Sequence, residues 1–393
     1  MSADRRKPSE DNMTKNINVV LMGCGGVGKQ LIQHIINSRS LHSKLGLHLR
    51  VVGVCDSTSF LVLPHVSDSK SEFNDSLLLE ICRVKSSGLS LSTISNARSG
   101  ECQIFTKKES TDKILDTAKL LGRSTGLAFI DCSASSETIG ILTKVVDFGC
   151  CAVLANKKPL TSSLEDYEKL FSHPRRIRHE STVGAGLPVI ASINRILTSG
   201  DPIHRVIGSL SGTLGYVMSE VEGGKPLSEV VRAAKGLGYT EPDPRDDLGG
   251  MDVARKALIL ARLLGWRINL DSIKVESLYP DEMDPDKMSV EDFLSSGLPS
   301  LDDDIRKRFG VASSNGNVLR YVCSIEGSSC QVGIKELPKD SPLGRLKGSD
   351  NVLEVYSRCY NELPLVIQGA GAGNDTTAAG VLADILDLQD LFP

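Results

Sequence analysis

Strand-like apolar runs alternate with helical stretches in the first part of this 393-residue chain. The runs lie at 18–22, 49–56, 127–135 and 152–155. They are mainly continuous rather than alternating, as buried parallel strands are. After the first run, Leu31, Ile32 and Ile35 recur at helical spacing. This order predicts an α/β fold with a Rossmann-type doubly wound parallel sheet. The polar stretch at about 60–110 is expected to be a helix-containing elaboration of the same domain.

The pattern changes in the middle of the chain. Small residues are frequent at 179–188, a strand and a glycine turn follow at 206–214, and apolar positions after Gly250 return every three or four residues, as in a half-buried helix. We therefore expect a second, α+β domain with its own sheet. Near the end, a glycine loop at 368–373 leads into a small-residue helix through Leu386, which we interpret as the chain returning to the first domain. The expected parts are 1–165, 166–365 and 366–393.

Composition narrows the class of protein. Lysine and arginine number 45 against 49 aspartate and glutamate, a net charge of −4, so no basic field for nucleic acid or anionic membrane is expected. No apolar stretch approaches the roughly 20 residues that span a bilayer. The polar opening at 1–11 lacks the apolar core of a signal peptide. The ten cysteines form no CxxC pair, which favours reduced thiols. A cytoplasmic protein that binds neither nucleic acid nor membrane is expected.

The first strand leads into a glycine turn, Gly23-Cys24-Gly25-Gly26-Val27-Gly28, and then into a helix. This context is typical of dinucleotide binding, because backbone N–H groups at the helix N-terminus meet the pyrophosphate. We expect NAD or NADP to contact Gly25, Gly26, Val27 and Gly28. Asp56 ends the next strand and is a candidate partner for the adenosine ribose; it follows Gly28 by 28 residues rather than about 20, and a turn aspartate is the alternative. The hydroxyl residues at 57–59 could favour a 2′-phosphate, so the choice between NAD and NADP stays open.

A dense group of charges surrounds a rigid turn at 236–256. Pro242 and Pro244 restrict the backbone and hold the carboxylates on a stiff connector. Asp252 and Lys256 lie one turn apart on the helix that follows, so they project from the same face. A lone pair of this kind is commonly a weak surface ion pair. Three further carboxylates lie beside it in the sequence: Glu241, Asp246 and Asp247. The cluster therefore indicates a binding or catalytic site.

Other polar residues follow the predicted strands. Ser133 and Lys157 come after strands at whose carboxyl ends α/β sheets bind ligands, and Lys157 is expected near the reactive end of the cofactor. Cys150-Cys151 allows a second hypothesis, because a cysteine after a dinucleotide-binding domain could be the nucleophile of an acylating aldehyde dehydrogenase. The residues around it are apolar and no histidine is close in sequence, so a buried structural pair is favoured.

Together these motifs resemble one family, the homoserine dehydrogenases. The resemblance rests on the glycine fingerprint and on further segments in the family's order, at 156–159, 180–188, 211–214, 238–256 and 369–376. It covers almost the entire chain, with 60–125 the least matched part. We expect no aspartate kinase region before the match, and the residues after it are too few for an ACT domain. The resemblance is therefore to the short monofunctional form.

This resemblance implies reversible NAD(P)H-dependent reduction of L-aspartate 4-semialdehyde to L-homoserine, in the biosynthesis of threonine, methionine and isoleucine. It implies that Lys157 and Lys256 are catalytic and that Asp252 orients them, which suits the chemistry, because a positioned ammonium stabilises and protonates the developing oxyanion. The implied substrate-binding residues are Thr213, Glu241, Asp246 and Asp247. The implied cofactor-binding residues are Gly25, Gly26, Val27, Gly28, Asp56, Ser133, Asn156, Lys157, Gly373 and Thr376.

The resemblance also implies a homodimer, in which the second domain provides both the substrate site and the dimer contact. A Na⁺ or K⁺ ion is implied at backbone oxygens of the segment Glu180, Val183, Ala185 and Leu187, for which a structural turn is the alternative. One departure is Gly249, where family members often carry Asn or Ser. Two other functions remain open. A dinucleotide-binding redox sensor would not need both lysines, whereas a dehydrogenase of another small amino-acid semialdehyde would share the charged pocket.

Overall fold

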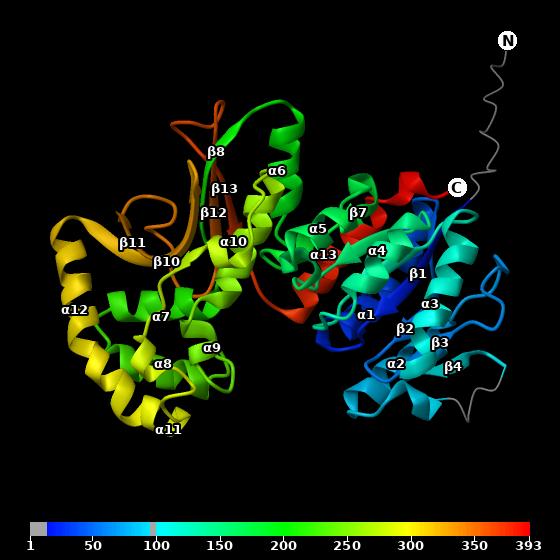
Figure 1. Ribbon diagram of the computed structural model, residues 1–393, viewed down its shortest axis with the longest axis horizontal. Coiled ribbons are helices and arrows are strands. Elements are labelled where there is room, and N and C mark those ends of the chain that lie inside the picture. Colours follow the sequence, from blue (N-terminus) through cyan, green and yellow to red (C-terminus); the bar gives the residue numbers. More distant parts are fainter. Residues whose placement is uncertain (1–13, 95–99) are drawn as a thin grey trace, which may run out of the picture.

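The computed structural model describes residues 14–94 and 100–393, and the polar opening at 1–11 lies outside them. The described chain forms two sheets with their own helices, which lie side by side as two lobes (Figure 1). The first is a Rossmann-type α/β lobe and the second is α+β, so the predicted fold class is confirmed.

The first sheet has the strand order β4-β3-β2-β1-β5-β6-β7. Its strands are β1 (Lys15–Met22), β2 (Leu47–Cys55), β3 (Ser59–Val62), β4 (Gln103–Thr106), β5 (Ala128–Asp131), β6 (Cys151–Leu154) and β7 (Ile177–Arg178). Its helices are α1 (Gly26–Lys44), α2 (Asp75–Ser86), α3 (Lys107–Gly122), α4 (Ile139–Asp147) and α5 (Leu164–Leu170). In this sheet the neighbouring strands β2, β1, β5, β6 and β7 pair in parallel. The strand order reverses between β1 and β5, which is where α/β sheets bind ligands.

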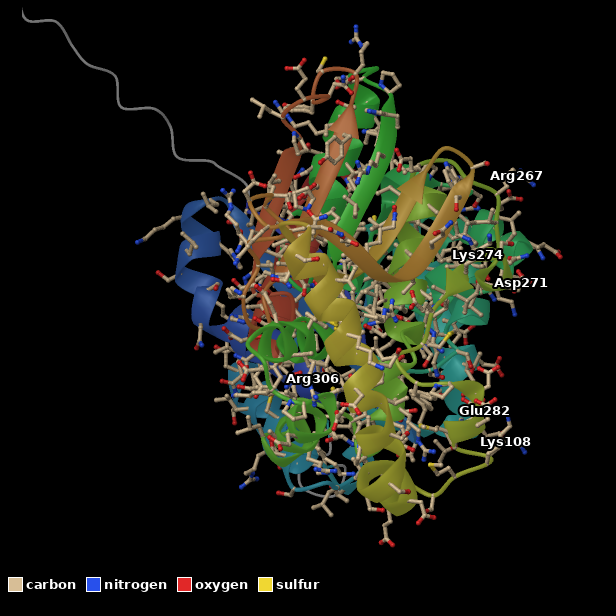
Figure 2. All side chains as sticks on the ribbon, turned by 90° about the vertical axis from the view of Figure 1, so that its left-hand side faces the viewer. Lys108, Arg267, Asp271, Lys274, Glu282 and Arg306 are labelled. Atoms are coloured by element: carbon tan, nitrogen blue, oxygen red, sulfur yellow. The ribbon has the colours of Figure 1, made fainter. Side chains whose placement is uncertain are left out.

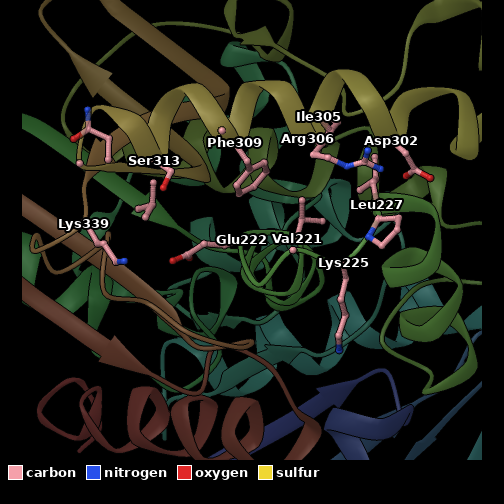
Figure 3. Close-up of a pocket in the computed structure, with 16 residues that line it drawn as sticks. Val221, Glu222, Lys225, Leu227, Asp302, Ile305, Arg306, Phe309, Ser313 and Lys339 are labelled. Atoms are coloured by element: carbon pink, nitrogen blue, oxygen red, sulfur yellow. The ribbon is translucent and has the colours of Figure 1, made fainter.

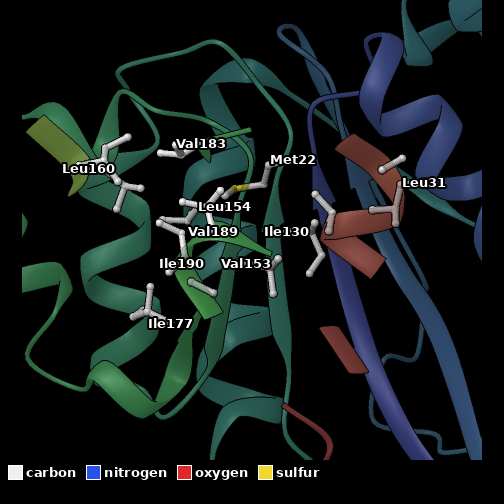
Figure 4. Close-up of a cluster of buried hydrophobic side chains, with 14 of the residues drawn as sticks. Met22, Leu31, Ile130, Val153, Leu154, Leu160, Ile177, Val183, Val189 and Ile190 are labelled. Atoms are coloured by element: carbon white, nitrogen blue, oxygen red, sulfur yellow. The ribbon is translucent and has the colours of Figure 1, made fainter. Parts of the chain in front are cut away.

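The continuous apolar runs form these strands because both faces of the sheet are covered. β5 and β6 are buried along their whole length. Figure 4 shows Val153 and Leu154 of β6 beside Val189 and Ile190, at the start of α6 (Val189–Thr198). Burial of side chains of this size stabilises the fold by about 1.5–3 kcal/mol each. The packing also fixes the position of the β6 carboxyl end, where Lys157 follows.

The stretch at 60–110 differs in part from the prediction. It contains α2, as expected, but also β3 and β4, which extend the sheet with antiparallel strands. Phe60 and Leu61 are fully buried in β3, which lies between β2 and the edge strand β4, so this short strand belongs to the core. In addition, β7 pairs with β6 beyond residue 165. The expected domain boundary at 165 therefore falls among elements of the first lobe.

The second sheet has the order β13-β12-β8-β10-β11-β9 and is antiparallel except for the β11–β9 pair. Its strands are β8 (Ile203–Ser209), β9 (Lys274–Val275), β10 (Asn317–Glu326), β11 (Ser329–Pro338), β12 (Asn351–Ser357) and β13 (Leu365–Gly369). The helices of this lobe are α6, α7 (Gly212–Glu222), α8 (Leu227–Gly236), α9 (Arg245–Leu248), α10 (Met251–Leu263), α11 (Val290–Asp292) and α12 (Leu298–Ser314). α7 and α10 pack on β10, which places the charged block against this sheet.

The chain finally crosses back to the first lobe. The link after β13 runs from the second sheet into α13 (Asn374–Leu386), which packs against α1 (Figure 1). Val381 and Ile385 of α13 are fully buried. The last segment therefore packs against the helix that follows the glycine turn, although more than 300 residues separate α13 from that turn in the sequence.

The surface carries charges of both signs. Figure 2 shows exposed side chains projecting from the outer elements, among them Lys108, Arg267 and Asp271. Within the described residues, no helix combines the length and the apolar character needed to cross a bilayer.

Candidate active site

The helix α10 begins at a turn that only glycine fits. Gly250 is its N-cap, with a left-handed φ of 74°, and a Cβ there would lie 1.9 Å from the Tyr321 hydroxyl. The turn places Asp252 in the first turn of α10, where a carboxylate is favoured by the helix dipole. Asp252 Oδ2 is 2.7 Å from Lys256 Nζ, as the four-residue spacing predicts.

Lys157 reaches the same carboxylate from the other lobe. It follows β6, and its Nζ lies 3.2 Å from Asp252 Oδ1. Lys256, which is 8% exposed, also donates to the Leu210 carbonyl at 2.7 Å. Burial works to raise the pKa of Asp252, but the Lys256 and Lys157 ammonium groups hold that pKa well below its ordinary value. We call Lys157, Asp252 and Lys256 the lysine–aspartate bridge; its carboxylate stays ionised and fixes both ammonium groups.

A cavity of about 290 Å³ opens beside this bridge. Its walls come from distant parts of the chain: Val27 in the glycine turn, Ser133 after β5, Lys157, Lys256, Thr182 and Gly371. The predicted catalytic lysines and the predicted cofactor segments therefore meet at one cavity. This is the arrangement that a reaction between a dinucleotide and a small substrate requires.

A larger cavity, about 460 Å³, lies in the second lobe between α7, α8 and α12 (Figure 3). Val221 and Phe309 project into it. Its acids are already paired: Glu222 lies 2.7 Å from Arg320 and 2.9 Å from Lys347, and Asp302 accepts hydrogen bonds from Ser228. None of the predicted site residues lines this cavity. The smaller cavity is therefore the candidate site despite its size.

The glycine turn before α1 has the form expected of a phosphate cradle. A Cβ on Gly28 would lie 2.0 Å from the Gly23 carbonyl oxygen, so the tight turn needs glycine. A Cβ on Gly25 would meet nothing within 4 Å and would occupy open space in front of the turn. No side chain caps α1 and no acid lies in its first turn. The N–H groups of Gly26 and Val27 are therefore available to an anion.

Two further cofactor candidates, Asn156 and Ser133, lie just after the carboxyl ends of β6 and β5. Asn156 is buried and donates from Nδ2 to Asp131 Oδ2 at 3.0 Å and to the Ser135 carbonyl at 2.7 Å. Ser133 donates to Asp131 Oδ1 at 2.6 Å. Asn156 thus ties the end of β6 to the segment after β5, directly before Lys157. At the other wall, Gly373 has φ of 117° and Thr376 donates to loop carbonyls at the start of α13.

Asp56 lies at the end of β2 as expected, but its carboxylate is already satisfied. Oδ1 accepts from the backbone and hydroxyl groups of Thr58 and Ser59, at 2.9–3.0 Å. Oδ2 accepts from Lys85 Nζ and the Leu91 N–H, both at 2.9 Å. Although burial would raise the pKa of Asp56, these donors hold it well below its ordinary value. The turn-aspartate alternative accounts for the contacts of Oδ1, and Lys85 and Leu91 occupy Oδ2. The ribose role remains a prediction against which these contacts argue.

The charged connector before α10 is held by a residue that sequence reasoning missed. Arg245 is 3% exposed and forms a bidentate ion pair with Asp243. It also donates to the Met283 and Met288 carbonyls, at 2.9 and 2.7 Å. Its guanidinium also lies over the Phe293 ring. One signal was available: an arginine among four acids at 241–247 is an expected partner for one of them.

The predicted substrate residues lie on and beside this connector. Asp247 accepts from the Glu241 N–H at 2.8 Å, and burial raises the pKa of Asp247, with the charges of Glu241 and Asp252 acting in the same direction. Thr213, at the start of α7, donates to the Tyr239 carbonyl at 2.6 Å. The Glu241 and Asp246 side chains are exposed. The structure therefore brings Asp247 into the electrostatic field of Asp252, but it places Asp246 at the surface.

The predicted cation segment contains a strained turn. Ala185 has φ of 57°, and within the described part of the chain it alone combines a positive φ with a Cβ. The Glu180 carboxylate caps α6 by accepting from the Ile190 and Ala191 N–H groups, at 2.6 and 2.8 Å. The Glu180 carbonyl accepts from Val183, and the Leu187 carbonyl from Val189. No described residue donates to the Val183 or Ala185 carbonyls, so these two oxygens retain ligand capacity. The ion itself remains a prediction.

The cysteine hypothesis finds no support in the structure. Burial raises the pKa of Cys150 to about 12, and burial also raises that of Cys151. Nucleophilic cysteines have lowered pKa values in electropositive, partly exposed surroundings. Cys150-Cys151 is therefore a buried structural pair.

Comparison with known proteins bears on these observations. The family model for homoserine dehydrogenase matches residues 188–386. The bifunctional aspartokinase/homoserine dehydrogenase of Haemophilus influenzae is 34% identical over 95% of this chain and 43% of its own length. The homoserine dehydrogenase of Paracoccidioides brasiliensis is 38% identical over 70% of this chain and 77% of its own. The chain thus spans about two fifths of the bifunctional relatives it matches.

Solved structures share the fold. A Candida auris protein of unknown function aligns with a TM-score of 0.81 and 32% identity, over 96% of this chain and 99% of the other. A hyperthermophilic archaeal homoserine dehydrogenase in complex with NADPH aligns with a TM-score of 0.69 and 23% identity, over the same shares. At that identity the second alignment concerns the fold alone.

Proposed function

Because this chain belongs to the homoserine dehydrogenase family, we propose that it catalyses the reversible NAD(P)H-dependent reduction of L-aspartate 4-semialdehyde to L-homoserine. The observation that carries this proposal is the lysine–aspartate bridge beside the 290 Å³ cavity. It presents two ammonium groups where the glycine turn, the β5 and β6 ends and the loop before α13 converge.

The cofactor would be held by the cradle before α1. Gly25, Gly26, Val27 and Gly28 would meet the pyrophosphate, while Ser133, Asn156, Gly373 and Thr376 would border the rest of the molecule. The open space at Gly25 and the uncapped α1 N-terminus fit an anion of this kind. The archaeal neighbour was solved with NADPH, which supports a nicotinamide cofactor here. When bound, that cofactor supplies or accepts the hydride.

The chain's own contribution is to manage charge on the substrate oxygen. During reduction, negative charge develops on the carbonyl oxygen, and Lys157 or Lys256 stabilises it and transfers a proton to it. In the reverse direction the same lysine accepts the hydroxyl proton. Asp252 remains ionised and keeps both ammonium groups in place, so little reorganisation is needed during the reaction. Glu241 and Asp247 would bind the amino end and the hydroxyl region of the substrate, and Thr213 and Asp246 would be further substrate-binding residues.

Three further proposals accompany this function. The chain would comprise a nucleotide-binding part, a substrate-binding and dimerisation part, and a returning segment at 366–393. The pairing of β7 with β6 supports a first boundary after β7. It would act as a homodimer. The free carbonyls of Val183 and Ala185, with those of Glu180 and Leu187, would hold a Na⁺ or K⁺ ion and so stabilise the turn at Ala185.

The test is NADPH and NADH oxidation with L-aspartate 4-semialdehyde, together with the reverse reaction from L-homoserine. Lys256→Ala is expected to lower kcat by about two orders of magnitude or more and to leave NADPH binding intact. The matched control is Lys158→Ala, because Lys158 neighbours Lys157 but is exposed; this variant is expected to keep wild-type turnover. NADPH binding without turnover in either direction would indicate the redox sensor instead. Turnover with a different semialdehyde alone would indicate the other dehydrogenase.

A further inference from the structure

Asn351 is a buried polar side chain with no partner. It is the first residue of β12, pairs with Gly369 of β13, and is 1% exposed. Neither Oδ1 nor Nδ2 forms a hydrogen bond with any residue that the structure describes. A buried amide in this state is unfavourable, because it has lost its water contacts without replacement. An apolar side chain of similar size would avoid this loss, so the amide needs an explanation.

The glycine loop at 369–373 lies directly on this amide. A Cβ built on Gly371 would be 1.9 Å from Asn351 Nδ2 and 2.0 Å from its Cγ, so only glycine permits the contact. Gly371 also lines the cavity that contains Lys157 and Lys256. This glycine therefore contacts the Asn351 amide and borders the cavity as well.

The loop has unused peptide groups and contains glycines, which permit backbone rotation. Among the described residues, nothing forms a hydrogen bond with the N–H or C=O groups of Ala370 or Gly371. Ala370 and Ala372 are exposed. Gly373 has φ of 117°, a conformation that glycine adopts without strain. The loop also forms the link between the two lobes, after β13 and before α13 (Figure 1).

We propose that Asn351 is a positioning residue for the reaction described above. When a dinucleotide enters the cavity, the loop closes, and the Asn351 amide donates to and accepts from the peptide groups of Ala370 and Gly371. The unpaired groups on the two sides then satisfy each other, and the loop is held in place beside the cavity. This inference rests on the proposed function for its substrate, but loop closure by NADPH can be measured without turnover.

The experiment compares wild type with Asn351→Leu and Asn351→Ala. Three quantities are measured on the full chain: the thermal midpoint without ligand, the hydrogen–deuterium exchange of loop amides with and without NADPH, and the steady-state constants. Asn351→Leu is expected to melt at or above the wild-type temperature, because it removes the unpaired groups. In both variants, NADPH should no longer slow exchange at 370–372. Their kcat/KM should fall about tenfold or more, mainly through KM, which corresponds to about 1.4 kcal/mol.

Ser357→Ala is the matched control on the same strand. Ser357 is also fully buried, but its hydroxyl donates to Asp201 at 2.6 Å. This variant should melt lower than wild type and keep the NADPH protection of the loop. The proposal is overturned if both Asn351 variants keep that protection, or if their loss of activity only follows their unfolded fraction. Wild-type protection by NADPH without turnover would support the closure and refute the proposed reaction.

Discussion

Substituting Gly250 by alanine should destabilise the protein more than substituting the glycine at the opposite end of α10. Both positions have a left-handed φ, 74° at Gly250 and 88° at Gly265, so alanine carries about 1–2 kcal/mol of backbone strain at either. At Gly265 a Cβ meets nothing within 4 Å. At Gly250 the Cβ would lie 1.9 Å from the Tyr321 hydroxyl. Tyr321 is 2% exposed, and its hydroxyl donates to the Glu276 carbonyl at 2.7 Å.

The clash therefore adds to the strain. Losing the Tyr321 hydrogen bond costs about 0.5–1.5 kcal/mol, and displacing a packed ring costs about 1–3 kcal/mol. We expect Gly250→Ala to lower the free energy of unfolding by about 2.5–6.5 kcal/mol and Gly265→Ala by about 1–2 kcal/mol, measured by urea denaturation. Because Gly250 starts the helix that aims Asp252, kcat should also fall in the first variant only.

A double variant isolates the contact. Tyr321→Phe removes the hydroxyl but leaves the ring carbon that would lie 2.9 Å from the new Cβ. In that background, Gly250→Ala should cost at least about 1 kcal/mol less than in the wild type, since contacting residues are not additive. Equal destabilisation by Gly250→Ala and Gly265→Ala would refute this account of the turn.

Three further predictions concern other parts of the molecule. Burial raises the pKa of Asp384 from 3.8 to about 7. The folded protein therefore binds this proton more tightly than the unfolded chain does. As pH rises from about 4 to about 7, the contribution of Asp384 to the free energy of unfolding should fall, by at most about 4 kcal/mol. Asp384→Asn, which can still accept from the Glu180 N–H, should flatten that profile, and an unchanged slope would exclude Asp384 as its source. Arg245→Lys should lower the free energy of unfolding by about 2–4 kcal/mol, because one ammonium cannot replace the paired contacts to Asp243 and two carbonyls. Asp56→Asn should destabilise the turn at 56–59 without changing the ratio of NADPH to NADH turnover; a changed ratio would show that this carboxylate contacts the ribose.

The features best predicted from the sequence are those that depend on the spacing and type of residues close together in the chain. The Asp252–Lys256 pair follows from helical spacing alone, and the return of α13 was inferred from a glycine loop before a small-residue helix. The strands β5 and β6 were predicted because fully buried strands leave continuous apolar runs. β3 also has a continuous apolar run, at 60–63, which the prediction overlooked. β4 is only partly buried and leaves no such run, so it is defined by its pairing with β3.

The remaining differences have a common physical cause, which is that a side chain's partners depend on tertiary contacts. Asp56 was placed correctly at a strand end, but Lys85 and Leu91, about 30 residues later, take its second oxygen. Arg245 was overlooked because the carbonyls that it binds, at Met283 and Met288, belong to a loop without a recognisable motif. The sequence gives no sign of the role of Asn351, because only the folded structure shows that a buried amide lacks hydrogen-bond partners.

The position of the candidate site explains why its residues are dispersed through the chain. The cavity lies at the switch point of the first sheet, and its walls are loops that follow the strands together with residues of α1, α10 and α13. Lys157 comes from one of these loops and is 31% exposed, so it needs an external group to hold it; Asp252, on a helix of the other lobe, provides that group at 3.2 Å. A rotation between the lobes would lengthen this contact before it disturbed the Lys256–Asp252 pair, which lies within one helix. The geometry of Lys157 should therefore report the relative position of the lobes, whereas that of Lys256 should not.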